Sequence, residues 1–213
     1  MAGSPETAKS PRFDSSSLPG VFKASALSER SLRLPPEIAD AFPRLSLTFG
    51  RTVTCRGASA VSLSLRLAAQ ACPAASLTAV IAPRGLINPA AAREAELNLE
   101  RTMWVNVDHK DAASAAAMCM ESCAVVVVSA AINQRDARRL QARAMNASSV
   151  LILINTAAVD ADLAFITSGE RWEGLLGGYG YLKDREFELE VKARHSAPMQ
   201  PRVLRLNHVS HHA

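Results

Sequence analysis

The residues with the clearest chemical meaning form a turn between a predicted strand and a predicted helix. They are Arg56, Gly57, Ala58, Ser59, Ala60, Val61 and Ser62. A turn in this position binds phosphate when it has the pattern G-x-x-x-x-G-K-[ST]. In that pattern, backbone N–H groups cradle the phosphates, the lysine neutralises the terminal ones and the hydroxyl holds Mg²⁺. Nucleotide binding is therefore the chemistry to test at this turn.

The turn lacks the groups that nucleotide binding requires. No lysine occurs from residue 24 to residue 109, and the lysine position falls at Ala60 or Val61. Ser59 or Ala60 stands where the second glycine belongs, so that only Ser62 retains a useful hydroxyl. We therefore expect a degenerate phosphate loop and no nucleotide cofactor.

Strand and helix patterns alternate around this turn. The expected strands are 47–55, 77–82, 104–107, 124–130 and 150–154. Helix patterns separate them at 61–72, 89–101 and 111–122, and another helix follows Asn133, its expected cap. Strands that alternate with helices of this length form right-handed βαβ units in a mostly parallel sheet.

The C-terminal part of the chain has a different pattern. Leu163–Thr167 predicts another strand, and Gly174–Gly180 predicts a glycine-rich turn. Arg185–Arg194 alternates strictly between apolar and charged side chains. This alternation predicts a half-buried antiparallel strand at an edge of the sheet.

Two segments resemble the nucleotide-binding domain of the RecA family. The sequence T-V-T-C-R-G-A-S-A-V-S-L at 52–63 is similar to the opening strand, turn and helix of that domain. The sequence A-P-R-G-L-I-N-P-A-A-A-R at 82–93 is similar to the segment after its second strand. The resemblance implies an α/β fold, a RecA-like three-layer domain with a mostly parallel central sheet and a C-terminal antiparallel edge.

The expected RecA-like domain covers residues 46–195. Residues 1–20 are rich in serine and proline and predict a flexible tail. Residues 21–45 predict a helical or linker segment with a short helix at 37–42. Residues 196–213 contain two prolines and predict a second flexible tail.

The resemblance also places two acidic groups of the RecA family at positions where this chain has none. Arg84 stands where a catalytic glutamate would activate water, and an arginine stays protonated. Ser129 stands where an aspartate at the end of a strand would hold the metal, and a serine brings no charge. We therefore expect a protein that is not an enzyme.

One group within the RecA superfamily shares a further pattern with this chain. Residues 177–182 read G-G-x-G-x-L and residues 185–191 read R-x-F-x-L-x-V, which resembles the ImuA and ImuA-prime accessory proteins of bacterial mutasomes. Membership would imply a scaffold role in damage-induced translesion DNA synthesis, with a partner surface partly in the C-terminal region. The partners would be ImuB, an inactive Y-family polymerase homologue, and indirectly an error-prone C-family polymerase. Two alternatives stay open: a SulA-type inhibitor of the tubulin-like division protein, and a divergent RecA-like ATPase.

Three groups of side chains are candidate contact surfaces for a protein partner or DNA. The first is a stripe on the helix after Asn133, made of Arg135, Arg139 and Arg143 with Arg138 beside it. The second is the aromatic group Trp172, Tyr179 and Tyr181. The third is the basic and apolar strip Arg202, Leu204, Arg205 and Leu206. Self-association is compatible with the same surfaces.

Composition sets the remaining expectations. The net charge of +4 permits contact with nucleic acid without requiring it. The apolar runs are shorter than the ~20 residues of a membrane span, and the N-terminus lacks the apolar core of a signal peptide, so we expect a cytoplasmic protein. The 4 cysteines, among them Cys119 and Cys123 near His109, predict packed thiols and no metal site.

Overall fold

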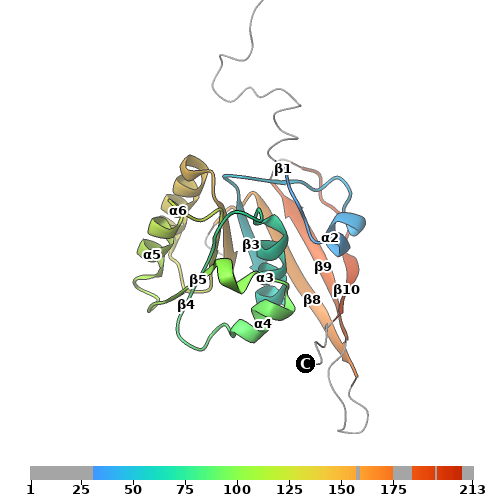
Figure 1. Ribbon diagram of the computed structural model, residues 1–213. Coiled ribbons are helices and arrows are strands. Elements are labelled where there is room, and N and C mark those ends of the chain that lie inside the picture. The colour runs from blue at the N-terminus through green and yellow to red at the C-terminus, as the bar shows by residue number, and fades with distance from the viewer. Residues whose placement is uncertain (1–30, 157–158, 175–183, 195, 208–213) are drawn as a thin grey trace, which may run out of the picture. The chain divides into compact units, whose positions relative to one another are not determined.

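A single large sheet carries the fold in the computed structural model, which describes residues 31–156, 159–174, 184–194 and 196–207 (Figure 1). Its strands are β3 (Thr52–Arg56), β4 (Thr78–Ala82), β5 (Thr102–Asn106), β6 (Val125–Val128), β7 (Val150–Ile154), β8 (Leu163–Glu173), β9 (Asp184–Ala193) and β10 (Arg202–Asn207). Their order in the described sheet is β10-β9-β8-β3-β7-β6-β4-β5. Neighbouring strands from β8 to β5 are parallel, whereas β9 and β10 join by antiparallel pairing. The predicted fold class, a mostly parallel α/β sheet with an antiparallel edge, is confirmed.

Helices cover both faces of this sheet. They are α2 (Pro36–Ala41), α3 (Ala60–Ala71), α4 (Pro89–Glu94), the 3-10 helix η2 (Leu99–Arg101), α5 (Ala112–Cys119) and α6 (Gln134–Ala147). The buried side chains of α2, α3 and α4 belong to one core cluster, and those of α5 and α6 belong to the other. The result is the expected three-layer arrangement (Figure 1).

The central strands follow directly from their sequence. All residues of β6 and β7 are buried, because a strand with helices on both sides has two apolar faces. Asn133 caps α6 as predicted, since its Oδ1 accepts a hydrogen bond from the backbone N–H of Asp136 at 2.9 Å.

Two predicted elements are interrupted in the structure. The first expected strand divides into β2 (Leu47–Thr48) and β3, with Gly50 at φ +78° in the turn between them. The helix that begins at Pro89 ends at Glu94 and does not reach Arg101, because Glu96 has φ +63°. A positive φ is incompatible with a continuing right-handed helix.

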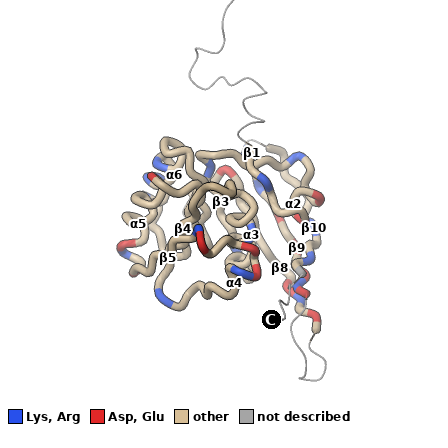
Figure 2. The backbone as a smooth tube through the Cα atoms, viewed as in Figure 1, with Lys and Arg blue, Asp and Glu red and all other residues tan. Residues whose placement is uncertain are grey.

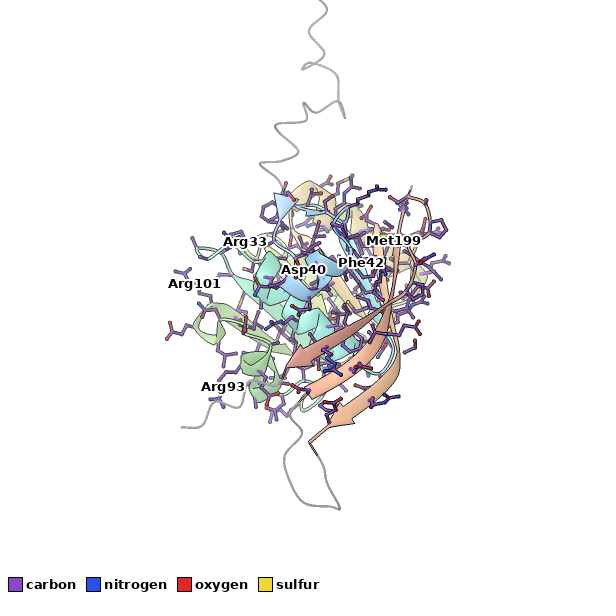
Figure 3. All side chains as sticks on the ribbon, turned by 90° about the vertical axis from the view of Figure 1, so that its right-hand side faces the viewer. Arg33, Asp40, Phe42, Arg93, Arg101 and Met199 are labelled. Carbon is purple, nitrogen blue, oxygen red and sulfur yellow. The ribbon has the colours of Figure 1, made fainter. Side chains whose placement is uncertain are left out.

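The segment before residue 46 contributes to the core. The short helix expected at 37–42 is present as α2, and its neighbour Phe42, labelled in Figure 3, is buried together with Ile38. Arg66 of α3 holds α2 in place through an ion pair of 3.0 Å with Glu37. The strand β1 (Ser31–Leu32) pairs with β2. Residues 31–45 are therefore part of the folded unit and not a linker, while residues 1–30 lie outside the described part.

The prediction of a flexible tail after residue 196 is wrong for β10. Leu204 lies opposite Phe187 of β9 and is 5% exposed. The strand β9 is therefore not the edge of the described sheet, although its antiparallel pairing and its alternation are as predicted. Residues 208–213 lie outside the described part.

The cysteines are free thiols, and two of them are in the core. Burial raises the pKa of Cys55 to about 12, and burial together with the nearby Cys119 and Cys72 raises that of Cys123 to about 11. The side chain of His109 is engaged elsewhere, because its Nδ1 accepts a hydrogen bond from Ala131 N–H at 3.0 Å. Among the residues described, no cluster of His, Cys, Asp or Glu could hold a metal ion, and no helix has the length and apolarity to cross a membrane.

Replacing Leu204 tests whether β10 is part of the core. Leu204→Ala should lower the free energy of unfolding by about 2–4 kcal/mol, because it removes buried methyl groups and leaves a cavity. Val203→Ala, at a neighbouring position that is 64% exposed, is the control and should change it by less than about 1 kcal/mol. Urea unfolding followed by circular dichroism measures both, and equal effects would contradict the placement of β10.

Candidate functional site

The candidate nucleotide site is the turn between β3 and α3. Arg56 is the last residue of β3, and Ala60, Val61 and Ser62 are already in the first turn of α3. Only Gly57, Ala58 and Ser59 connect the two elements. A phosphate-binding loop has four residues between its two glycines alone. The connection is therefore too short to wrap around a phosphate group.

Backbone N–H groups of this turn are already used within the protein. Gly57 N–H donates to Oδ1 of Asn155 at 3.2 Å, and Ser59 N–H donates to Oγ1 of Thr167 at 3.2 Å. Ala60 N–H donates to the carbonyl of Gly57 at 3.2 Å. In a phosphate-binding loop such groups point at the ligand. Here their partners are Asn155, which directly follows β7, and Thr167 of β8.

Gly57 is required at its position by the close approach of β8. Its φ is +103°, and a Cβ atom placed there would lie 2.1 Å from the carbonyl oxygen of Thr167. No side chain fits in that space. The one glycine that the degenerate loop retains therefore serves the packing of β3 against β8.

A chain of polar contacts extends from Ser59 into β8 and β9. Ser59 Oγ donates to Oε1 of Glu170 at 2.9 Å, and the same carboxylate forms an ion pair of 3.1 Å with Arg185. The side chains of Arg185 and Glu170 are 9% and 21% exposed. The guanidinium also lies 4.8 Å from the centre of the Trp172 ring. We call this set the Ser59–Glu170–Arg185 chain.

The ion pair keeps a largely buried charge compensated. Burial lowers the pKa of the Arg185 guanidinium, while the charge of Glu170 and its hydrogen bond oppose that effect. An arginine remains protonated in either case. Without Glu170, Arg185 would remain largely buried and would lose the carboxylate of this ion pair.

The chain of contacts has a consequence for any anion at this turn. A carboxylate beside the first residues of α3 stands close to the place where a phosphate would bring its own negative charge. Repulsion between the two charges adds to the missing lysine and to the N–H groups that are already bonded. The arrangement is one that stabilises the fold without a ligand.

Sequence reasoning missed Thr167, Glu170 and Arg185 as members of this site. Glu170 lies 111 residues from Ser59 along the chain. The sequence around Glu170 indicates only the polar end of a strand. The parallel pairing of β3 with β8 brings them together. The only local signal was Arg185, which occupies an apolar position of the alternating segment.

The other two altered positions also lie at ends of parallel strands. Arg84 is exposed in the turn after β4. Ser129 directly follows β6, is buried, and donates its backbone N–H to the carbonyl of Ile81 at 2.9 Å. The residues that directly follow β3, β4, β6 and β7 are Gly57, Pro83, Ser129 and Asn155. None of the four is acidic, so none of them offers a carboxylate to Mg²⁺.

The arginine stripe lies on the exposed side of α6. Arg135, Arg138, Arg139 and Arg143 are all exposed, whereas Ala137, Leu140 and Ala144 are buried against α5 and the sheet. Arg143 forms an ion pair with Glu121, and Arg139 lies 3.8 Å from Asp136. The four arginines thus lie on the side of α6 away from the core, and their contact with a partner or DNA stays a prediction.

The C-terminal candidates divide into exposed and buried residues. Trp172, Arg202 and Arg205 are exposed, and Leu206 is partly buried. Leu204 was wrongly predicted as a contact residue, because it points into the core. Val203 is exposed and was missed, since the alternation of β10 was not recognised. Tyr179 and Tyr181 lie outside the described residues.

Comparison with known proteins gives a family and a fold. Residues 40–159 match the family described as the MT3502 N-terminal domain. The crystal structure of the RadB recombinase superposes with a TM-score of 0.55 at 15% identity, covering 79% of this chain and 92% of that one. This likeness shows that the fold is RecA-like. SulA from Pseudomonas aeruginosa gives a TM-score of 0.41 at 19% identity, covering 48% of this chain and 95% of SulA. No curated protein matches the sequence.

The Ser59–Glu170–Arg185 chain can be tested by unfolding measurements. Glu170→Ala should lower the free energy of unfolding by about 3 kcal/mol, because it leaves a largely buried arginine without its carboxylate. Glu190→Ala is the matched control, since its ion pair with Lys192 is exposed and should contribute less than about 1 kcal/mol. Adding Arg185→Met to Glu170→Ala should recover part of the loss. A Glu170 variant as stable as the Glu190 variant would contradict a stabilising role of this chain of contacts.

Proposed function

Because this chain belongs to the family of the MT3502 N-terminal domain and has a RecA-like fold, we propose that it is a non-catalytic accessory protein that acts by binding other macromolecules. One observation carries the proposal. The turn that binds phosphate in nucleotide-binding relatives is three residues long here and is tied to Asn155, Thr167 and Glu170. Because the hydrogen-bond donors of this turn already have partners within the protein, few groups remain to stabilise a triphosphate and its Mg²⁺.

We further propose that the process is damage-induced translesion DNA synthesis. Support comes from the resemblance of residues 177–182 and 185–191 to the ImuA and ImuA-prime accessory proteins. The segment 185–191 lies in β9, where Phe187, Leu189 and Val191 are its buried apolar side chains. The direct partner would be an ImuB-like inactive Y-family polymerase homologue, which would connect this protein to an error-prone C-family polymerase.

The strand β10 is the surface that we assign to this protein partner. It is one edge of the described sheet, and β5 is the opposite edge. An edge strand offers unpaired backbone groups to another chain. Val203 supplies an apolar contact there, and Arg202 supplies a charge. Both residues are in the C-terminal region, where the resemblance places part of the partner surface.

Partner binding is tested by pull-down with the full chain. The ImuB-like homologue should be retained, and Val203→Glu should reduce retention at least about tenfold, because a charge at an apolar contact is desolvated without compensation. Met118→Glu on α5 is the control, since Met118 is 71% exposed and lies away from β10. The tubulin-like division protein is the comparison bait. Its retention in place of the polymerase homologue would refute the assignment to translesion synthesis.

Nucleotide binding is tested by calorimetry of the full chain with ATP and Mg²⁺. No binding heat is expected at micromolar ligand, because the turn has neither the lysine nor the acidic metal ligands of the phosphate-binding pattern. A RecA-like ATPase that retains its lysine serves as the positive control in the same buffer. Saturable, Mg²⁺-dependent binding of ATP would refute the non-catalytic proposal and support a divergent ATPase.

A further inference from the structure

A groove between α5 and α6 has the charge and the lining of a site for a polyanion. Its volume is about 550 Å³, and its polar lining includes Lys110 and Ser114 from one side and Asp136, Arg139, Arg143 and Asn146 from the other. It lies on the face of the sheet opposite to α2, α3 and α4. The β3–α3 turn and the strand β10 contribute nothing to its lining.

Positive charge is concentrated on α6. This helix of 14 residues carries four arginines and one aspartate, and Figure 2 shows basic segments along it. Lys110 adds a further cation to the lining of the groove, although Asp108 and Asp111 flank it in the sequence. The charge that an incoming ligand meets is therefore mainly that of the arginines of α6.

The arginines have a regular spacing along the helix. Arg135, Arg139 and Arg143 are four residues apart, so that their backbone positions advance by about 6 Å at each step. This step is close to the distance between successive phosphates of a nucleic-acid strand. Guanidinium groups bind phosphate with two parallel hydrogen bonds, which a lysine cannot do.

The positive charge of α6 is only weakly compensated within the protein. The contact of Arg139 with Asp136 is 3.8 Å long, and the arginine side chain is 76% exposed. The ion pair of Arg143 with Glu121 is also exposed. Exposed pairs of this kind contribute at most about 1 kcal/mol each, so a phosphate can replace the carboxylate. Arg135 and Arg138 form no ion pair with any described residue.

The rest of the lining distinguishes between kinds of polyanion. The small residues Ala113, Ala117 and Ala142 lie between the charged side chains, and no aromatic residue lines the groove. A protein interface usually depends on a buried aromatic or large apolar anchor. Single-stranded nucleic acid is usually held by bases stacked on aromatic rings. No aromatic residue is available here, and the large apolar residue of the lining, Leu140, is buried at 2% exposure. The lining therefore favours contacts to a regular phosphate backbone.

We propose that the α5–α6 groove, with Arg135, Arg138, Arg139 and Arg143, binds the phosphate backbone of double-stranded DNA without sequence selectivity. This site goes beyond the proposed function, because it needs neither β10 nor a polymerase partner. It would place an accessory protein on the nucleic acid while the opposite end of the sheet remains free for a protein.

Fluorescence anisotropy with a labelled 20-base-pair duplex of mixed sequence tests the site. The full chain should bind with an affinity that falls steeply between 50 and 200 mM salt, because each neutralised phosphate releases counterions. The double variant Arg135→Gln/Arg139→Gln should weaken binding about tenfold and reduce the salt slope by about two, one for each lost phosphate contact. Two duplexes of unrelated sequence should give the same values.

The matched control removes the same charge elsewhere. Arg33→Gln/Arg93→Gln changes two exposed arginines that lie near α2 and α4 (Figure 3) and should bind like the unchanged chain within about twofold. Equal weakening by both double variants would overturn the site, since net charge alone would then explain binding. A single strand or a polyglutamate bound more tightly than the duplex would overturn it as well. Loss of the pull-down by Val203→Glu with DNA binding intact would separate this site from the partner surface.

Discussion

The packing of β8 against the β3–α3 turn is the constraint on which the rest of the structure depends. Gly57 has no room for a side chain because the backbone of Thr167 is adjacent. The hydroxyl of Thr167 accepts the N–H of Ser59 and donates to the carbonyl of Arg56. Glu170, which lies within the register shift of β8 between Ser168 and Arg171, accepts the hydrogen bond of Ser59 Oγ and forms an ion pair with Arg185 of β9. Polar contacts therefore connect the β3–α3 turn with the strands β8 and β9.

The hydrogen bonds of the β3–α3 turn stabilise the folded protein and leave its donors unavailable to a ligand. A phosphate-binding turn leaves donors unsatisfied until the ligand arrives, and such buried donors destabilise the free protein. Here Asn155 and Thr167 satisfy the donors permanently, and Glu170 supplies the negative charge from within. The missing lysine and the short, internally bonded turn are therefore consistent with each other. The carboxylate of Glu170 supplies the negative charge that the positive N-terminal end of α3 favours.

Much of the fold could be predicted from the sequence, and the errors have physical reasons. Buried parallel strands such as 150–154 are continuous apolar runs, and Asn133 is a strong helix cap, so local signals were sufficient for both. The strand β10 was missed because the sequence R-V-L-R-L-N is short, basic and preceded by two prolines. At the site, the absence of the lysine and of the two acidic residues could be predicted from their positions in the sequence pattern. The role of Glu170 could not, because only the pairing of β3 with β8 brings it to Ser59.

The distribution of charge differs between the proposed DNA site on α6 and the antiparallel strands of the sheet. The helix α6 is basic, whereas the exposed side of β9 presents Glu186, Glu188 and Glu190 in succession. Arg205 of β10 pairs with Glu186, and Lys192 pairs with Glu190. Glu188 and Asp184 add further acid to β9. A phosphate backbone is attracted to the first surface and repelled by the second. The proposed DNA site and the proposed partner surface therefore differ in charge and in place, so that nucleic acid and a protein partner would not compete.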